Sequence, residues 1–148
     1  MCRDDIGSHF IRCTSVCFGG VQNWYMITHM DSILPYTLIA FAVLLIWGLL
    51  AFFFNQDGTQ AKRIVVCLNL IAAVDLFLIG VQELILHAYW MNLIGAWPQF
   101  FYLPVLRLGA SLTSWSSRVF LAYAASFLLM VGVSLLGCKL REKWRCER

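Results

Sequence analysis

Long runs of apolar residues with few charges or none are what most constrain the fold of this chain. Residues 33–54 carry no charged side chain, and as a helix these 22 residues would span about 33 Å. Further apolar runs cover 64–86 and 119–137. The hydrocarbon core of a bilayer is about 30 Å thick, and a helix satisfies every backbone polar group within its own segment. These runs therefore predict membrane-spanning helices.

The composition agrees with this interpretation. Of the 148 residues, 61% are hydrophobic and 13% are charged, and the mean hydropathy is +0.76. Such a chain has too little polar surface to cover a soluble globule, so lipid must solvate part of it. We expect an all-α fold, a multi-pass transmembrane helical bundle. An N-terminal tail with an interfacial segment would cover 1–32, the bundle 33–137 and a basic cytoplasmic tail 138–148.

A fourth apolar run, from 95 to about 113, is less regular than the others. It contains Pro98, Pro104 and Arg107. Proline is tolerated in a transmembrane helix when neighbouring groups satisfy the freed carbonyls. We predict four spans, with three spans plus a re-entrant segment over this run as the alternative.

The distribution of Lys and Arg predicts the orientation, because cytoplasmic loops are enriched in both. With four spans and both termini inside, seven cations lie inside (Arg3, Arg12, Lys139, Arg141, Lys143, Arg145 and Arg148) and three lie outside (Lys62, Arg63 and Arg118). With three spans the N-terminus lies outside, and the inside again holds seven. Both arrangements place the C-terminus in the cytoplasm. Its five cations would anchor the chain at an anionic membrane surface.

Asp75 lies in the middle of the second apolar run, where a charge is costly unless it faces other helices or water. At 100° per residue, a polar stripe spans an arc of about 140° on this helix. The stripe contains Asn69, Asp75, Gln82, Glu83 and His87. Val74, Phe77, Leu78, Val81 and Ile85 lie on the opposite side, so one side should face the bundle and the other lipid.

Arg107 is the predicted partner of Asp75. If the second and third runs form an antiparallel hairpin that turns near Met91, each of the two residues lies 16 positions from the turn and their membrane depths match. An ion pair there would satisfy both charges. Glu83, half-way back toward the turn, is the other candidate. The pair could fix the register of the hairpin, or the polar stripe could form a substrate, ion or proton site.

Other patterns carry less information about function. Ala110 with Ser114, and Ala122 with Ser126, have the small-xxx-small spacing that permits close helix packing. His9, His29 and His87 lack the spacing of metal ligands, so we expect no bound metal and no cofactor. Nucleic-acid binding is a poor explanation of a short basic stretch beside a membrane span.

The sequence favours a non-enzymatic role as a subunit or accessory protein of a larger membrane assembly. So short a chain leaves little material outside the membrane for a catalytic domain. The expected partners are the lipid bilayer and either another membrane protein or further copies of the chain. The alternative is a small oligomeric transporter or channel with a polar path through Asp75, Glu83 and Arg107.

Overall fold

The computed structural model describes residues 20–25, 27–28, 35–55, 61–88 and 93–147. Its long helices are α2 (Tyr36–Phe54), α3 (Ala61–Gly80), α4 (Leu93–Leu112) and α5 (Val119–Cys146). A π-helical turn, η1 (Val81–Ile85), directly continues α3. The described part of 20–28 is also helical, and no described residue lies in a strand. The predicted all-helical fold is confirmed, whereas most of the predicted 1–32 tail lies outside the described residues.

Three helical segments are long and apolar enough to cross a membrane: Tyr36–Phe54, Ala61–Ile85 and Val119–Cys146. They correspond to three of the predicted spans and suggest an integral membrane protein. Residues 93–112 form a continuous helix through both Pro98 and Pro104, but α4 is not among these three segments. Four spans are therefore not confirmed, and neither is a re-entrant segment.

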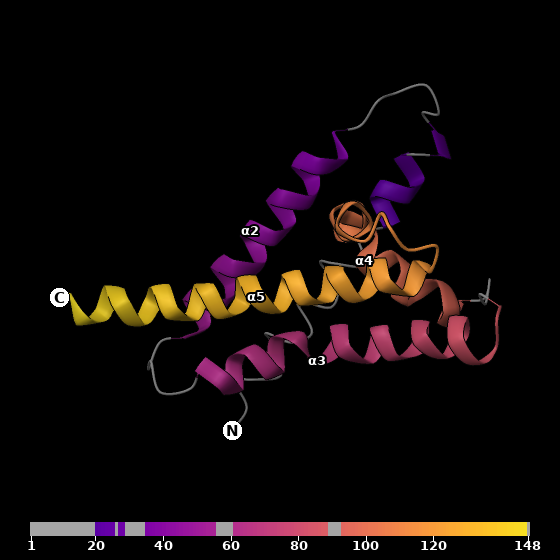
Figure 1. The fold of residues 1–148 in the computed structure, drawn as a ribbon. Helices are drawn as coiled ribbons and strands as arrows, with labels where there is room; N and C mark the ends of the chain where they lie inside the picture. Colours follow the sequence, from indigo (N-terminus) through magenta and orange to yellow (C-terminus); the bar gives the residue numbers. More distant parts are fainter. Residues whose placement is uncertain (1–19, 26, 29–34, 56–60, 89–92, 148) are drawn as a thin grey trace.

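Helix α5 packs against the other three long helices (Figure 1). Its buried positions recur about every four residues, which places them in one line along the helix. Most of them are small, and they are Ala122, Tyr123, Ser126, Met130, Ser134, Gly137 and Cys138. Small side chains let neighbouring backbones approach closely, which is how helices associate where lipid supplies no hydrophobic driving force.

Two glycines mark the closest of these approaches. A Cβ atom added at Gly109 of α4 would lie 2.2 Å from the carbonyl oxygen of Ala122, and one added at Gly137 would lie 2.3 Å from that of Gly48 on α2. The predicted small-residue pair Ala122 and Ser126 therefore does lie at a helix contact. Ala110 and Ser114 are exposed.

Contacts between the helices define which ends lie together. The Asn55 side chain, just after α2, donates a hydrogen bond from Nδ2 to the carbonyl oxygen of Cys138 at 3.2 Å. The C-terminal end of α2 thus lies beside the C-terminal part of α5. Helix α3 runs antiparallel to α5, because Asn69 contacts Ser134 while Gly80 lies against Phe120.

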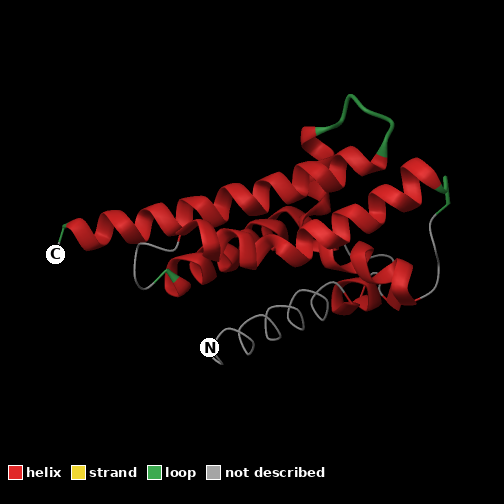
Figure 2. Ribbon diagram, turned by 90° about the horizontal axis from the view of Figure 1, so that it is seen from below, coloured by secondary structure: helices red, strands yellow, loops and turns green. Residues whose placement is uncertain are grey.

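Helix α4 is arranged differently from the other three. Part of it is seen nearly end-on in Figure 1, where α3 and α5 run across the view. In the turned view of Figure 2, α5 is the long helix that ends near the label C, and other helices cross behind it. The middle of α4 reaches α2 and α3, since the Phe101 ring lies 6.2 Å from that of Trp47 and Tyr102 bonds to Ala72. Helix α4 therefore lies across the bundle.

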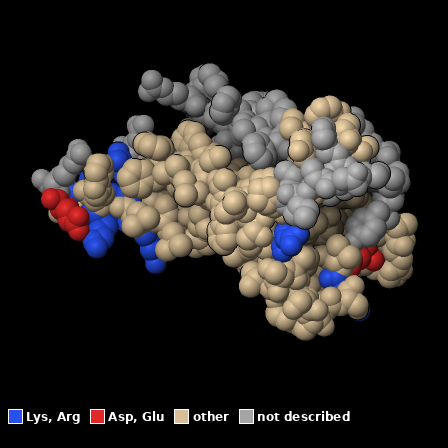
Figure 3. All heavy atoms as spheres, turned by 90° about the horizontal axis from the view of Figure 1, so that it is seen from above, with Lys and Arg blue, Asp and Glu red and all other residues tan. Residues whose placement is uncertain are grey.

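The outer surface is strongly apolar. Large exposed side chains line α2 and α3, and they include Leu38, Phe41, Leu45, Phe53, Val66, Leu70, Val74 and Phe77. On the face drawn in Figure 3, charged side chains gather at the C-terminal end of α5, and a broad uncharged band separates them from a second group. This distribution matches a hydrocarbon-facing belt between two headgroup regions.

The contact at Gly137 gives a direct test of the packing. Changing Gly137 to Ala should lower the free energy of unfolding in detergent by about 1–3 kcal/mol, because the new methyl group meets a backbone carbonyl. Gly132 is the matched control on the same helix, since a Cβ there meets nothing within 4 Å. Equal stability of the two alanine variants would contradict the close contact between α2 and α5.

Candidate functional site

The predicted polar stripe is partly enclosed by the bundle. Asn69, Asp75 and Gln82 are buried, and Asp75 is only 4% exposed. They share the buried side of α3 and η1 with Val65, Leu68, Ala72 and Ile79. Phe77, on the opposite side, is 70% exposed. This division follows from helical spacing, because residues three and four apart share a face.

Asn69 is the centre of a hydrogen-bonded junction between three helices. Its Oδ1 accepts a bond from Trp47 Nε1 of α2 at 3.3 Å. Its Nδ2 donates to Ser134 Oγ of α5 at 3.1 Å and to the Val65 carbonyl oxygen at 2.9 Å. Ser134 Oγ in turn donates to the Met130 carbonyl oxygen at 2.8 Å. The buried amide of Asn69 thus joins α2, α3 and α5.

Two tyrosines lie at the contacts that α4 makes. The Tyr102 hydroxyl of α4 donates to the Ala72 carbonyl oxygen at 2.5 Å, one turn before Asp75. The Tyr102 ring packs edge-on against Tyr123 of α5, with the centroids 5.7 Å apart. Glu83 lies beyond α3, in η1, and is half-buried. The Tyr102 hydroxyl thus joins α4 to α3 close to the buried Asp75.

Three members of the stripe lie beyond the last residue of α3: Gln82, Glu83 and His87. The π-helical turn η1 contains Gln82 and Glu83 and changes the rotation per residue, so a straight-helix projection no longer places His87, which follows η1. Leu86 donates from its N–H to the Val81 carbonyl oxygen, and Ala88 to that of Gln82. His87 between them has a positive φ of 50° and is exposed. It ends the helix and lies away from the buried residues.

Arg107 has different surroundings from those predicted. Its side chain is exposed, and its guanidinium carbon lies 5.6 Å from the centre of the Tyr36 ring, at the start of α2. A cation over an aromatic ring is a favourable arrangement. The described contacts thus bring Arg107 to α2, and its ion pair with Asp75 stays a prediction.

The basic C-terminal residues continue α5. The helix runs to Cys146, so Lys139, Arg141, Lys143 and Arg145 lie on its last turns, while Arg148 is outside the described residues. The Arg141 guanidinium carbon lies 5.0 Å from the centre of the Phe52 ring of α2. The exposed Lys143 and Glu147 approach to 3.9 Å. Anchoring at a membrane surface by these cations stays a prediction.

Several residues that complete the interior are missing from the sequence-based prediction. Trp47, Asn55, Tyr102 and Ser134 all bond to another helix. Only Ser134 had a sequence signal, because it continues the four-residue spacing of Ala122 and Ser126. In the described part of the chain, no group of three His, Cys, Asp or Glu side chains could hold a metal ion.

Comparisons with protein-family models, with curated proteins and with solved structures find no match to this chain.

The Asn69 junction predicts a measurable coupling between α2 and α3. Changing Asn69 to Leu leaves the indole N–H of Trp47 and the hydroxyl of Ser134 without this partner, and should cost about 1–2 kcal/mol of stability. Changing Trp47 to Phe removes the N–H but keeps an aromatic ring. The double variant should therefore be less destabilised than the sum of the single variants. Strict additivity in a denaturation cycle would contradict a direct bond.

Proposed function

We propose that this protein is a non-enzymatic subunit or accessory protein of a larger membrane assembly. The proposal rests mainly on the hydrogen bonds of Asn69, a buried polar residue of α3. Its amide bonds to Trp47 and Ser134 and joins the helices of the chain itself. A polar group used in this way stabilises a fixed arrangement of helices.

The close packing of the helices favours the accessory role over a role in transport. A conducting path needs polar side chains along a water-filled space. Here the backbones at Gly109 and Gly137 leave no room for even a methyl group against α5 and α2. The alternative is an oligomeric transporter or channel with a polar path through Asp75, Glu83 and Arg107, of which Asp75 is buried and Glu83 half-buried.

We further propose that α2, α3 with η1, and α5 cross the membrane while α4 returns to the side where it began. Two contacts support this arrangement: Asn55 meets Cys138 near one end, and Gly80 meets Phe120 near the other. Lys62 and Arg63, at the start of α3, then share a side with the cations that end α5. The positive-inside rule makes that side cytoplasmic and puts the start of α2 outside.

Cysteine accessibility in intact cells or sealed vesicles tests this topology. Four exposed positions serve as single-cysteine sites, with the other cysteines replaced: Lys62, Ala88, Ser117 and Cys146. An impermeant thiol reagent added outside should label cysteine at Ala88 and Ser117 and leave cysteine at Lys62 and Cys146 unlabelled. Four spans would instead put Ala88 with Cys146, and Lys62 with Ser117.

Two experiments distinguish the accessory role from a transport role: purification of the complex and measurement of flux in liposomes. The tagged chain, extracted from its native membrane with the surrounding lipid, should run as a complex with a different membrane protein in constant stoichiometry. The purified chain alone, in liposomes, should give no ion or solute flux above that of empty liposomes. A homo-oligomer with flux that is lost on changing Asp75 to Asn would overturn the accessory role in favour of transport.

A further inference from the structure

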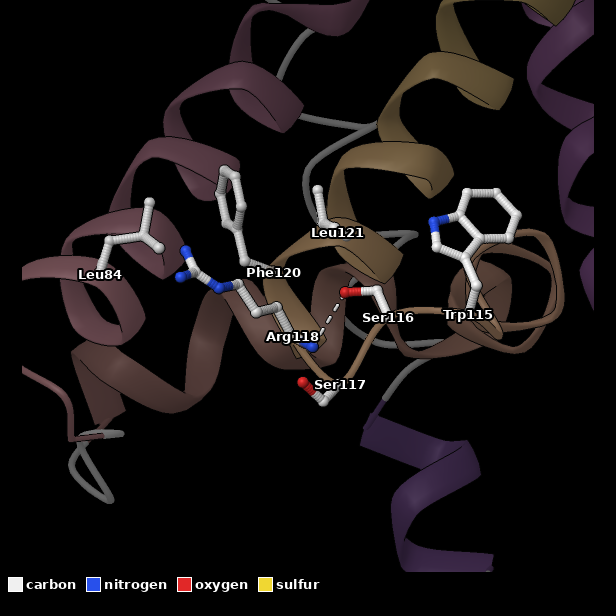
Figure 4. A pocket seen from close by; sticks show the side chains of 7 residues that line it. All are labelled: Leu84, Trp115, Ser116, Ser117, Arg118, Phe120 and Leu121. Carbon is white, nitrogen blue, oxygen red and sulfur yellow. Dashed lines mark hydrogen bonds between the residues drawn. The ribbon is translucent and has the colours of Figure 1, made fainter.

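We propose that a surface groove at the start of α5 binds the phosphate headgroup of a phospholipid. The groove lies between the end of the α3–η1 segment and the connection from α4 to α5 (Figure 4). It is lined by Leu84, Trp115, Ser116, Ser117, Arg118, Phe120 and Leu121. Cationic, hydroxyl and aromatic groups thus adjoin an apolar wall, a combination that suits a headgroup with an acyl chain attached.

The position of the groove along α5 fits a membrane boundary. Arg118 immediately precedes the helix, and Lys139 is the first cation after its apolar part, 21 residues or about 32 Å further on. This separation is close to the thickness of the hydrocarbon core. If Lys139 lies at one headgroup layer, Arg118 lies at the other. Trp115, with 81% of its side chain exposed, is typical of the interfacial aromatic belt.

The charge of Arg118 is available to an anion. Its backbone N–H donates to Ser116 Oγ at 3.1 Å, and its exposed guanidinium forms no salt bridge with a described residue. In Figure 4 the Arg118 side chain extends toward Leu84, while the Trp115 indole lies beyond Ser116. A phosphate near Arg118 would form charge-assisted hydrogen bonds with the guanidinium group.

The apolar wall argues for a lipid as the source of the phosphate. Phe120 and Leu121 are in the first turn of α5, and Leu84 is exposed on η1. Phe120 and Leu121 follow Arg118 and lie on its hydrocarbon side, while Leu84 lines the groove from the antiparallel α3–η1 segment, beyond the contact between Gly80 and Phe120. An acyl chain could run along Phe120 and Leu121 while its headgroup stays at Arg118. Inorganic phosphate has no apolar part that could cover these side chains. The inference depends on membrane insertion and is independent of the accessory role.

Lipid retention tests the groove. The full-length protein is purified in mild detergent, washed extensively, and analysed by native mass spectrometry and by total phosphorus. Wild-type protein should retain a phospholipid, and changing Arg118 to Gln should lower its occupancy roughly tenfold, as expected for loss of a charge-assisted hydrogen bond. Changing Trp115 to Ala should also lower it. Excess inorganic phosphate should leave the retained phospholipid in place.

Arg107 provides the matched control, since it is an exposed arginine outside the groove. The Arg107→Gln variant should retain phospholipid as the wild type does, and thermal melting should show that both arginine variants are folded. Equal retention by the Arg118→Gln variant and wild type would overturn the proposal. Equal loss in both arginine variants would do so too, because it would reflect general surface charge. Displacement by inorganic phosphate would identify a simple anion site instead.

Discussion

The line of small side chains along α5 is the constraint on which the rest of the structure depends. In lipid, apolar helices gain little by leaving their apolar solvent, so their association needs close backbone contact and hydrogen bonds. Ala122, Ser126 and Ser134 provide a shallow surface on α5, and Gly109 and Gly137 bring α4 and α2 into direct backbone contact with it. Helices α2 and α3 touch each other far less than each touches α5, so α5 holds the bundle together.

Hydrogen bonds then fix the arrangement that close packing allows. Asn69 would be unfavourable in hydrocarbon, but here its amide bonds to Trp47, Ser134 and its own helix. Asn55 and Tyr102 each bond to a carbonyl oxygen of another helix. Asp75 is buried in the same interior, one helical turn after the carbonyl oxygen of Ala72 that accepts the Tyr102 bond.

The sequence predicted those features that depend on the local pattern. Runs of about twenty apolar residues identified three helices that are long and apolar enough to cross a membrane. Helical spacing placed Asn69, Asp75 and Gln82 on the buried side of α3 and η1. The straight-helix projection failed at His87, because η1 changes the rotation per residue before the helix ends. A π-helical turn has no clear signature in a single sequence.

Contacts between helices could not be predicted from the local sequence pattern, because they depend on the angle and the distance at which two helices pack. The hairpin argument matched Asp75 and Arg107 by counting residues from a turn, but it assumed that the second and third apolar runs lie side by side. The Arg107 guanidinium lies over the Tyr36 ring at the start of α2, a contact that counting residues from a turn could not predict, and its pairing with Asp75 stays a prediction. Gly48, Gly109 and Gly137 look like ordinary membrane-helix glycines until the opposing backbone is known.

The central claim is that the start of α3 lies on the same side of the bundle as the C-terminal end of α5. Distances between pairs of spin labels test it most directly. One pair joins Lys62→Cys to Cys146, the other joins Ala88→Cys to Cys146, and all other cysteines are replaced. The distance from position 62 should be clearly the shorter, because the start of α3 lies at the C-terminal end of α5. A shorter distance from position 88 would contradict the arrangement.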